Sequence, residues 1–148
     1  MAGSDIVSAV LEFYAGYRSA FAAYDADRIV GFYRFPCHVV SDGDSVASLH
    51  FETPESLKPA VERVLELHRK IGARSGRLVL REITELSPRL VGMMLRSEMQ
   101  DADGVSLYDF QGFYSLVATD DGYRIAAISH NQIPRLLACV ARMTPATV

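Results

Sequence analysis

The sequence contains no tryptophan and only two cysteines, Cys37 and Cys139. Because these cysteines lie far apart and form no Cys-x-x-Cys pair, the sequence indicates neither a disulfide framework nor a zinc motif. Apolar runs are also short, well below the ~20 residues that a membrane helix needs. An acidic residue, Asp5, stands near the start of the chain, where a signal peptide requires basic residues followed by an apolar stretch. We therefore expect a cytoplasmic protein without a membrane span.

Clusters of like charge are missing as well, since 15 Lys and Arg residues and 18 Asp and Glu residues are interspersed and give a net charge of −3. The basic footprint of a nucleic-acid-binding protein is therefore absent. The sequence has no Gly-x-Gly-x-x-Gly or Gly-x-x-x-x-Gly-Lys loop for phosphate, and no Gly-x-Ser-x-Gly elbow for a nucleophilic serine. These absences argue against nucleic-acid binding, nucleotide binding and serine hydrolysis.

What the sequence does contain is apolar and aromatic area. Hydrophobic residues make up 49% of the chain, and they include seven Tyr and seven Phe. A chain of this length buries roughly two-thirds of its unfolded surface, which is enough for one hydrophobic core. Since no internal repeat, low-complexity segment or linker interrupts it, we expect one domain over residues 1–148.

The first half of the chain has helical periodicity. Apolar residues recur every three or four positions over residues 4–24, which predicts a helix with one buried stripe. Residues 25–27 interrupt the pattern, and a short second helix over residues 29–33 follows. A third helix is expected to have Thr53 as its N-cap and Pro54 in its first turn, and to end at Gly72.

The other predicted segments are extended. Residues 38–51, between the second and third helices, are typical of a hairpin around the turn Asp42-Gly43-Asp44. Turn clusters then separate four longer runs of β-type sequence, at residues 78–86, 90–99, 105–118 and 123–132. A tail over residues 135–143 has weak helical character. Three helices followed by a meander predict an α+β fold with a mostly antiparallel sheet and helices on one of its faces.

This order of elements resembles the nuclear transport factor 2-like (NTF2-like) superfamily, which includes ketosteroid isomerase, scytalone dehydratase, limonene epoxide hydrolase and the polyketide cyclases related to SnoaL. The resemblance covers residues from about 5 to 133 and rests on Tyr17, the Asp25-x-Asp27-x-Ile29-x-x-Phe32-Tyr33 segment, Val39–Gly43 and Asp121–Ile125. It implies a cone, in which a strongly curved sheet wraps a long helix around an internal cavity that binds a small hydrophobic ligand. It also implies a homodimer formed through the outer face of the sheet.

The resemblance further suggests three catalytic residues. Asp42 lies near the position of the general base of ketosteroid isomerase, and Tyr17 matches a tyrosine that stabilises the oxyanion. Tyr114 falls where that enzyme has a protonated aspartate on a late strand, so this chain departs from the pattern. The alternatives are that Asp42 is a turn residue and that both tyrosines are core residues with bonded hydroxyls.

His130 is a fourth candidate, because by alternation it shares a face with Ile128 on the last strand. An imidazole there can act as acid or base near neutral pH, or it can be a hydrogen-bonded histidine at the rim of the core. His68 lies on the apolar stripe of the third helix and is expected to be partly buried and bonded to a carbonyl. No pair of histidines has the spacing of a known metal motif, so no metal or other cofactor is expected.

The most aromatic segment is Tyr108–Tyr114. Alternation puts Phe113 on the outer face, where it would contribute to a dimer contact, and the even-numbered residues on the inner face. Gly112 would leave room there for a helix or a ligand. The residues expected to contact a ligand are Tyr14, Phe32, Tyr33, His38, Tyr108, Phe110, Gly112 and Ile128.

Three functions follow from these patterns. The first is a SnoaL-like domain that binds a small hydrophobic molecule without catalysis. The second is a cofactor-independent acid–base enzyme in which Asp42 is the base, His130 is the acid or second base, and Tyr17 and Tyr114 stabilise an oxyanion. The third is an auxiliary subunit or protein-binding module with an exposed apolar patch on the sheet. Asp42 and His130 both pointing into the cavity would favour the enzyme, because a pure binder gains nothing from burying ionisable groups. If both point to solvent, the enzyme loses its catalytic groups.

Overall fold

The computed structural model describes the backbone of residues 2–144 and the side chains of residues 5–144. Its helices are α1 (Ala2–Ala22), α2 (Ala26–Val30), α3 (Pro54–Ile71) and α4 (Gln132–Met143). Its strands are β1 (Tyr33–Ser41), β2 (Ala47–Phe51), β3 (Ser75–Ser87), β4 (Leu90–Gln100), β5 (Ser106–Thr119) and β6 (Gly122–His130). Within this described part, no helix is both long and apolar enough to cross a membrane.

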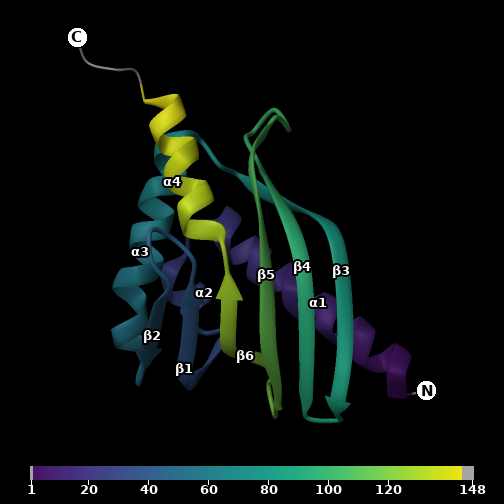
Figure 1. Cartoon of the computed structure of the whole chain (residues 1–148). Coiled ribbons are helices and arrows are strands. Elements are labelled where there is room, and N and C mark those ends of the chain that lie inside the picture. Colours follow the sequence, from purple (N-terminus) through teal and green to yellow (C-terminus); the bar gives the residue numbers. More distant parts are fainter. Residues whose placement is uncertain (1, 145–148) are drawn as a thin grey trace.

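The six strands form one curved sheet in the order β2-β1-β6-β5-β4-β3 (Figure 1). Neighbouring strands are antiparallel except for β1 and β6, which run parallel. The fold is therefore α+β with a mixed sheet, which confirms the predicted class. Irregular pairing between Leu78 and Leu80 and between Ser115 and Leu116 interrupts the ladders. Such bulges bend a strand and increase its twist, and they account for part of the curvature.

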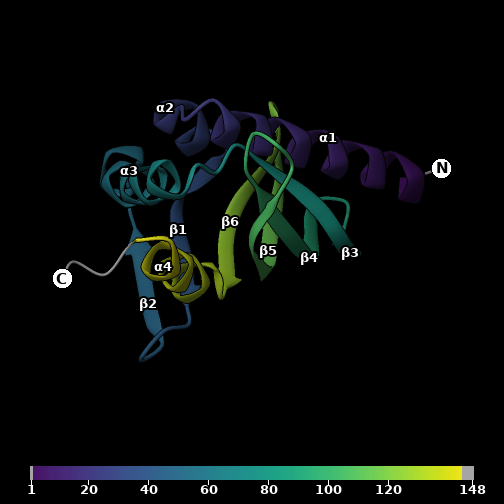
Figure 2. The same cartoon turned by 90° about the horizontal axis from the view of Figure 1, so that it is seen from above.

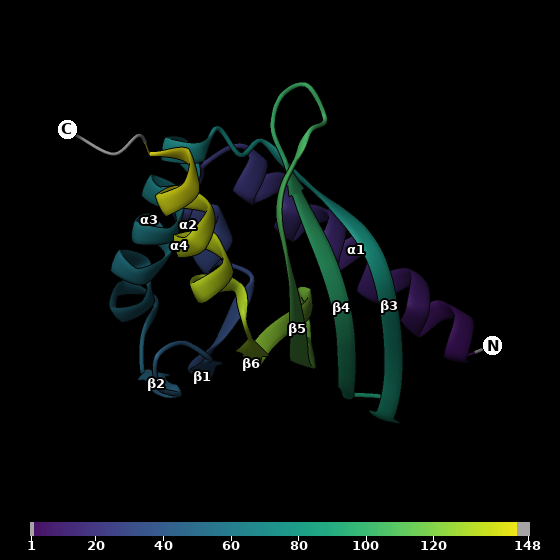
Figure 3. The same ribbon diagram turned by 45° about the horizontal axis from the view of Figure 1, so that its top comes forward.

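The longest helix, α1, crosses the inner face of this curved sheet and contacts β3 and β6 (Figure 2). The third helix, α3, packs instead against α2 and α4, and α4 also covers part of β5. Figure 3 shows α4 beside α3, and the connection between β4 and β5 projecting past the ends of the other strands. The core consequently lies between α1 and the inner side chains of β4 and β5, among them the buried Met93, Leu95, Phe110 and Tyr114.

Local signals account for the ends of α3. The Thr53 side chain accepts a hydrogen bond from the backbone N–H of Ser56 at 3.2 Å, and Pro54 follows in the first turn. At the other end Gly72 adopts a left-handed conformation with φ 73°, which glycine reaches without a steric penalty. The start and the end of this helix were both predicted from the sequence.

The prediction for the second helix was wrong at its C-terminal end. Helix α2 stops at Val30, and Tyr33 already begins β1, where it pairs with Ile125 of β6. The carbonyl of Phe32 accepts a hydrogen bond from the N–H of Ile125 at 2.8 Å. This parallel pairing joins segments that are distant in the sequence, so local periodicity does not reveal it.

The last strand is also shorter than predicted, and the last helix is longer. Strand β6 ends at His130, and α4 begins at Gln132 rather than at residue 135. Between them, the Asn131 side-chain oxygen accepts a hydrogen bond from the N–H of Gln111 at 2.8 Å, and the Asn131 N–H donates to the Gln111 carbonyl at 3.2 Å. The Asn131 side chain thus accepts a hydrogen bond that would otherwise require a backbone carbonyl, so the backbone can turn into α4 directly after β6.

Gly112 provides a test of how tightly the inner face is packed. A Cβ added there would lie 2.9 Å from Cε1 of the buried Tyr114 ring. We expect Gly112→Ala to lower the free energy of unfolding by about 1–3 kcal/mol, because this ring has little room to move. Urea unfolding measures the change. Gly43→Ala is the control: its added Cβ comes no closer than 3.5 Å to the Ser45 carbonyl oxygen, so a loss of similar size there would contradict the explanation.

Candidate functional site

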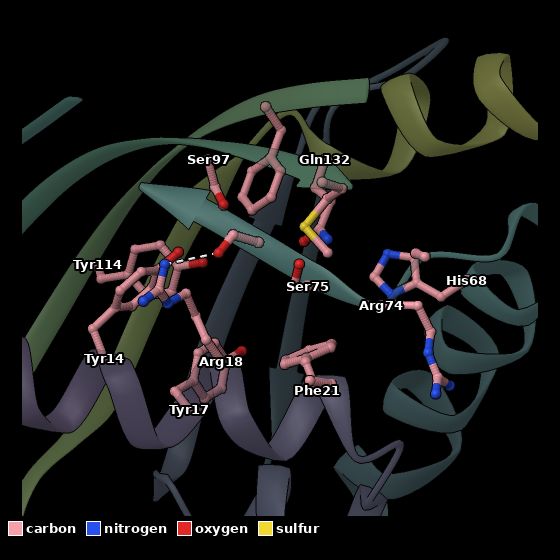
Figure 4. Close-up of a pocket in the computed structure, with 15 residues that line it drawn as sticks. Tyr14, Tyr17, Arg18, Phe21, His68, Arg74, Ser75, Ser97, Tyr114 and Gln132 are labelled. Atoms are coloured by element: carbon pink, nitrogen blue, oxygen red, sulfur yellow. Dashed lines mark hydrogen bonds between the residues drawn. The ribbon is translucent and has the colours of Figure 1, made fainter. Parts of the chain in front are cut away.

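A small pocket lies between α1 and the inner face of the sheet (Figure 4). Its cavity volume is about 40 Å³, room for roughly three water-sized groups. Five aromatic residues contribute to the lining: Tyr14, Tyr17, Phe21, Phe110 and Tyr114. The polar and charged lining residues are Arg18, His68, Arg74, Ser75, Ser97 and Gln132. None of the described residues that line the pocket is an aspartate or a glutamate.

Helix α1 contributes one face to this pocket. Tyr14, Arg18 and Phe21 are spaced by four and three residues, which brings them to the same side of a helix. The Arg18 Nη1 donates a hydrogen bond to the Gly76 carbonyl at the start of β3, at 2.7 Å, and the guanidinium carbon lies 5.4 Å from the centre of the Tyr14 ring. The Arg18 Nε is buried and has no hydrogen-bond partner in the described part of the chain. This buried and unused donor is the most unusual feature of the pocket.

Tyr17 is the centre of an aromatic cluster behind the pocket. Its ring centroid lies 5.1–6.4 Å from those of six other aromatic side chains: Phe13, Tyr14, Phe21, Phe32, Tyr33 and Tyr114. The hydroxyl groups of Tyr17 and Tyr33 share a hydrogen bond of 2.7 Å. Burial raises the pKa of both Tyr17 and Tyr114 well above the usual value, so both hydroxyls stay neutral. They can donate hydrogen bonds, but they cannot serve as bases near neutral pH.

His68 and its partners form the polar end of the pocket next to α4. The His68 Nε2 and the Tyr108 hydroxyl share a hydrogen bond of 2.7 Å, and the Gln132 side-chain amide donates to the same hydroxyl at 3.1 Å. His68 is more deeply buried than expected, and its bonded partner is a phenol rather than a carbonyl. Burial lowers the pKa of His68 to about 4, so the imidazole is neutral at pH 7.

A family model described as "NTF2-like protein (DUF6841)" matches residues 8–132. The chain belongs to this NTF2-like family. A comparison with curated proteins gives no match. Within residues 2–144 of this NTF2-like protein, no three His, Cys, Asp or Glu side chains are arranged to hold a metal ion.

Solved structures support the same assignment at the level of the fold. An NTF2-like protein of unknown function from Shewanella oneidensis is 13% identical with a TM-score of 0.67, over 85% of this chain and 98% of its own. An NTF2-like protein from Novosphingobium aromaticivorans is 12% identical with a TM-score of 0.66, over 95% and 90%. A ketosteroid isomerase-like protein from Erwinia carotovora atroseptica is 16% identical with a TM-score of 0.62, over 85% and 95%. At such identities the likeness establishes the fold alone.

The NTF2-like fold brings some of the predicted site residues together. Four of them line the pocket: Tyr14, Tyr17, Phe110 and Tyr114. Tyr108 is linked to the pocket through His68. Three others lie outside the lining: Phe32 and Tyr33 pack behind Tyr17, and Ile128 is buried on β6. Gly112 is buried too, and the ring of Tyr114 occupies the space next to it.

Three predicted residues lie away from the pocket. Asp42 is exposed in the turn between β1 and β2, where its backbone N–H donates to the His130 carbonyl at 3.1 Å. His130 is half-buried, its Nδ1 accepts a hydrogen bond from the N–H of Gln132, and burial lowers its pKa. His38 is exposed, and its ring lies 5.0 Å from that of His50, because the inward position on this strand belongs to the buried Cys37. The roles assigned to these three from the sequence stay predictions.

Two further residues of the pocket have a signal in the sequence but were not among the predicted site residues. Arg18 interrupts the apolar stripe of the first helix, between Tyr14 and Phe21, and a cation in such a stripe indicates either a buried charge or a binding group. Ser97 alternates with Leu95 and Met99 on the inner side of β4, and it is 1% exposed. Both positions follow from periodicity, but only the structure shows that they meet at the same pocket.

The depressed pKa of His68 predicts a loss of stability in acid. The unfolded chain binds a proton near pH 6.5, whereas the folded chain resists protonation down to about pH 4, so stability falls as the pH drops through this interval. Between pH 7 and pH 4.5 we expect wild type to lose about 2 kcal/mol more than His68→Gln. Urea unfolding at both pH values tests this difference.

The control for this comparison is His50→Gln. His50 is exposed, and replacing it leaves the buried His68 in place, so this variant is expected to lose as much stability as wild type. His130 and the carboxylates contribute equally in all three proteins. Equal losses in wild type and His68→Gln would contradict the assignment of a buried, neutral imidazole.

Proposed function

We propose that this NTF2-like protein binds a small molecule with an apolar body in the pocket between α1 and the sheet. The observation that carries the proposal is the pocket itself, whose lining combines five aromatic side chains with six polar or charged ones. Concave sites with an aromatic lining and few polar groups are typical of small-molecule binding. The cavity of about 40 Å³ is well below the ~300–1,000 Å³ of most ligand sites. The ligand is therefore small, or only one end of it enters the pocket.

The alternative, an acid–base enzyme, has less support. Asp42 is exposed in a turn rather than held in a dry site, and the lining residues that the structure describes include no carboxylate. His68 supplies an imidazole to the lining, but its lowered pKa makes it a weak base at neutral pH. Binding without assigned catalysis is therefore the function that we favour.

Ala22 allows the pocket to be blocked without changing the core. It is an exposed lining residue at the end of α1, and the next residue, Ala23, is exposed outside the lining. We expect benzoate, benzamide and benzyl alcohol to shift the amide NMR signals of lining residues in wild type. Ala22→Trp should abolish these shifts, because the indole covers the entrance, whereas Ala23→Trp should retain them. The proposal would be contradicted if none of the three compounds shifted these signals in wild type, or if the two variants showed equal shifts.

The outer face of the sheet fits a second proposal, a cytoplasmic homodimer. Met94 and Phe113 are directly paired on β4 and β5 and are 40% and 43% exposed. Gly92 makes room for this arrangement, since a Cβ there would lie 2.8 Å from Cζ of Phe113. Adjacent exposed apolar side chains on a sheet are typical of a contact between subunits. The free cysteines, both buried, suit a reducing compartment.

The dimer predicts a mass of twice the 16.3 kDa of one chain. Light scattering after size-exclusion chromatography measures this mass. Phe113→Glu should give the mass of one chain, because a buried unpaired carboxylate opposes association. Val46→Glu, at a residue 67% exposed in the turn between β1 and β2, should leave the dimer intact. A wild-type protein with the mass of a single chain at micromolar concentration would refute the proposal.

A further inference from the structure

The unpartnered Nε of Arg18 identifies the chemistry of the ligand more closely. We infer that Arg18 binds a carboxylate, and that the pocket therefore takes a small monocarboxylic acid whose head group enters first. This inference rests on the proposed binding function and adds the class of ligand to it.

The guanidinium has one donor engaged, at Nη1, and one buried donor without a partner, at Nε. Its Nη1 donates to the Gly76 carbonyl at 2.7 Å, which holds the group against the start of β3. The opposite edge carries Nε–H and an N–H of Nη2, and these two donors point in parallel. Two parallel N–H groups match the two oxygens of a carboxylate, in the bidentate arrangement that arginine forms with acids. A neutral amide or alcohol can use only part of this fork.

The charge of the pocket favours an acid for a second reason. Arg18 and Arg74 are the charged residues in the described lining, and His68 is neutral at pH 7. The Tyr14 ring offers its face to the Arg18 guanidinium, but it does not neutralise the charge. A buried donor on a charged group without a partner is costly, and an anion removes this cost. An amine would meet two like charges instead.

The size of the cavity limits the part of the ligand that enters. A volume of about 40 Å³ holds roughly three heavy atoms, which is a carboxylate group. The rest of the acid would then contact the aromatic lining and the exposed residues of the entrance, Ala22 and Arg74. Acids with a small apolar body, such as propionate and benzoate, are therefore the probes of choice.

The experiment compares acids with neutral molecules of the same shape. Isotope-labelled protein is titrated by NMR with benzoate, benzamide and benzylamine, and with propionate against propionamide. In wild type we expect benzoate to bind at least tenfold more tightly than benzamide, and benzylamine to bind more weakly than both. In Arg18→Met the preference for benzoate should vanish while benzamide binding is retained. Arg18→Lys keeps the positive charge but not the two parallel N–H donors, so it should retain only part of the preference for benzoate over benzamide.

Arg63→Met is the matched control, because Arg63 is an exposed arginine on α3 outside the pocket, and it should behave like wild type. Equal binding of benzoate and benzamide in wild type would overturn the inference but leave the proposed function standing. Binding of none of these compounds would overturn both. If Arg18→Met fails to fold, the comparison of benzoate with benzamide in wild type still decides the question.

Discussion

The packing of aromatic side chains around Tyr17 is the constraint on which the rest of this structure depends. A strongly curved sheet encloses space, and that space has to be filled if the fold is to be stable. Here rings from α1, β1 and β5 meet at Tyr17, and the hydroxyl of Tyr33 satisfies its one polar atom. Side chains therefore fill most of the interior of the cone. The remaining cavity is small because tyrosines and phenylalanines occupy the volume that a larger ligand would need.

This filling determines where chemistry can occur. The polar groups of the pocket lie at the margin of the cluster, where Arg18 reaches Gly76 and where His68 meets Tyr108. Four different elements hold these groups in place, since Arg18 lies on α1, Gly76 on β3, His68 on α3 and Tyr108 on β5. The NTF2-like fold supplies the frame, but the character of the pocket comes from these particular side chains. A pocket whose described lining has basic residues and no carboxylate is suited to hold an anion rather than to abstract a proton.

The candidate catalytic residues show why position in the sequence predicted only in part which residues lie at the pocket. Asp42 lies in the region expected from the resemblance, yet the turn between β1 and β2 exposes it to solvent. Tyr17 and Tyr114 are both at the pocket, where they combine the packing role with bonded or buried hydroxyls. Alternation along β5 correctly separated the buried Tyr108, Phe110 and Tyr114 from the exposed Phe113, since side-chain direction in a strand is a local property. Whether an inward residue meets a cavity or another ring depends on the elements opposite to it.

The sequence by itself determined the α+β class, the ends of α3 and the inward faces of α1 and β5, because caps, glycine conformations and periodic burial act within a few residues. Only the tertiary structure decided the parallel pairing of β1 with β6, the early end of α2 and the turn from β6 into α4 at Asn131. These features depend on hydrogen bonds between segments far apart in the chain. The same holds for the pocket, where Arg18, His68 and Ser97 become neighbours of one cavity through the curvature of the sheet, which no local pattern specifies.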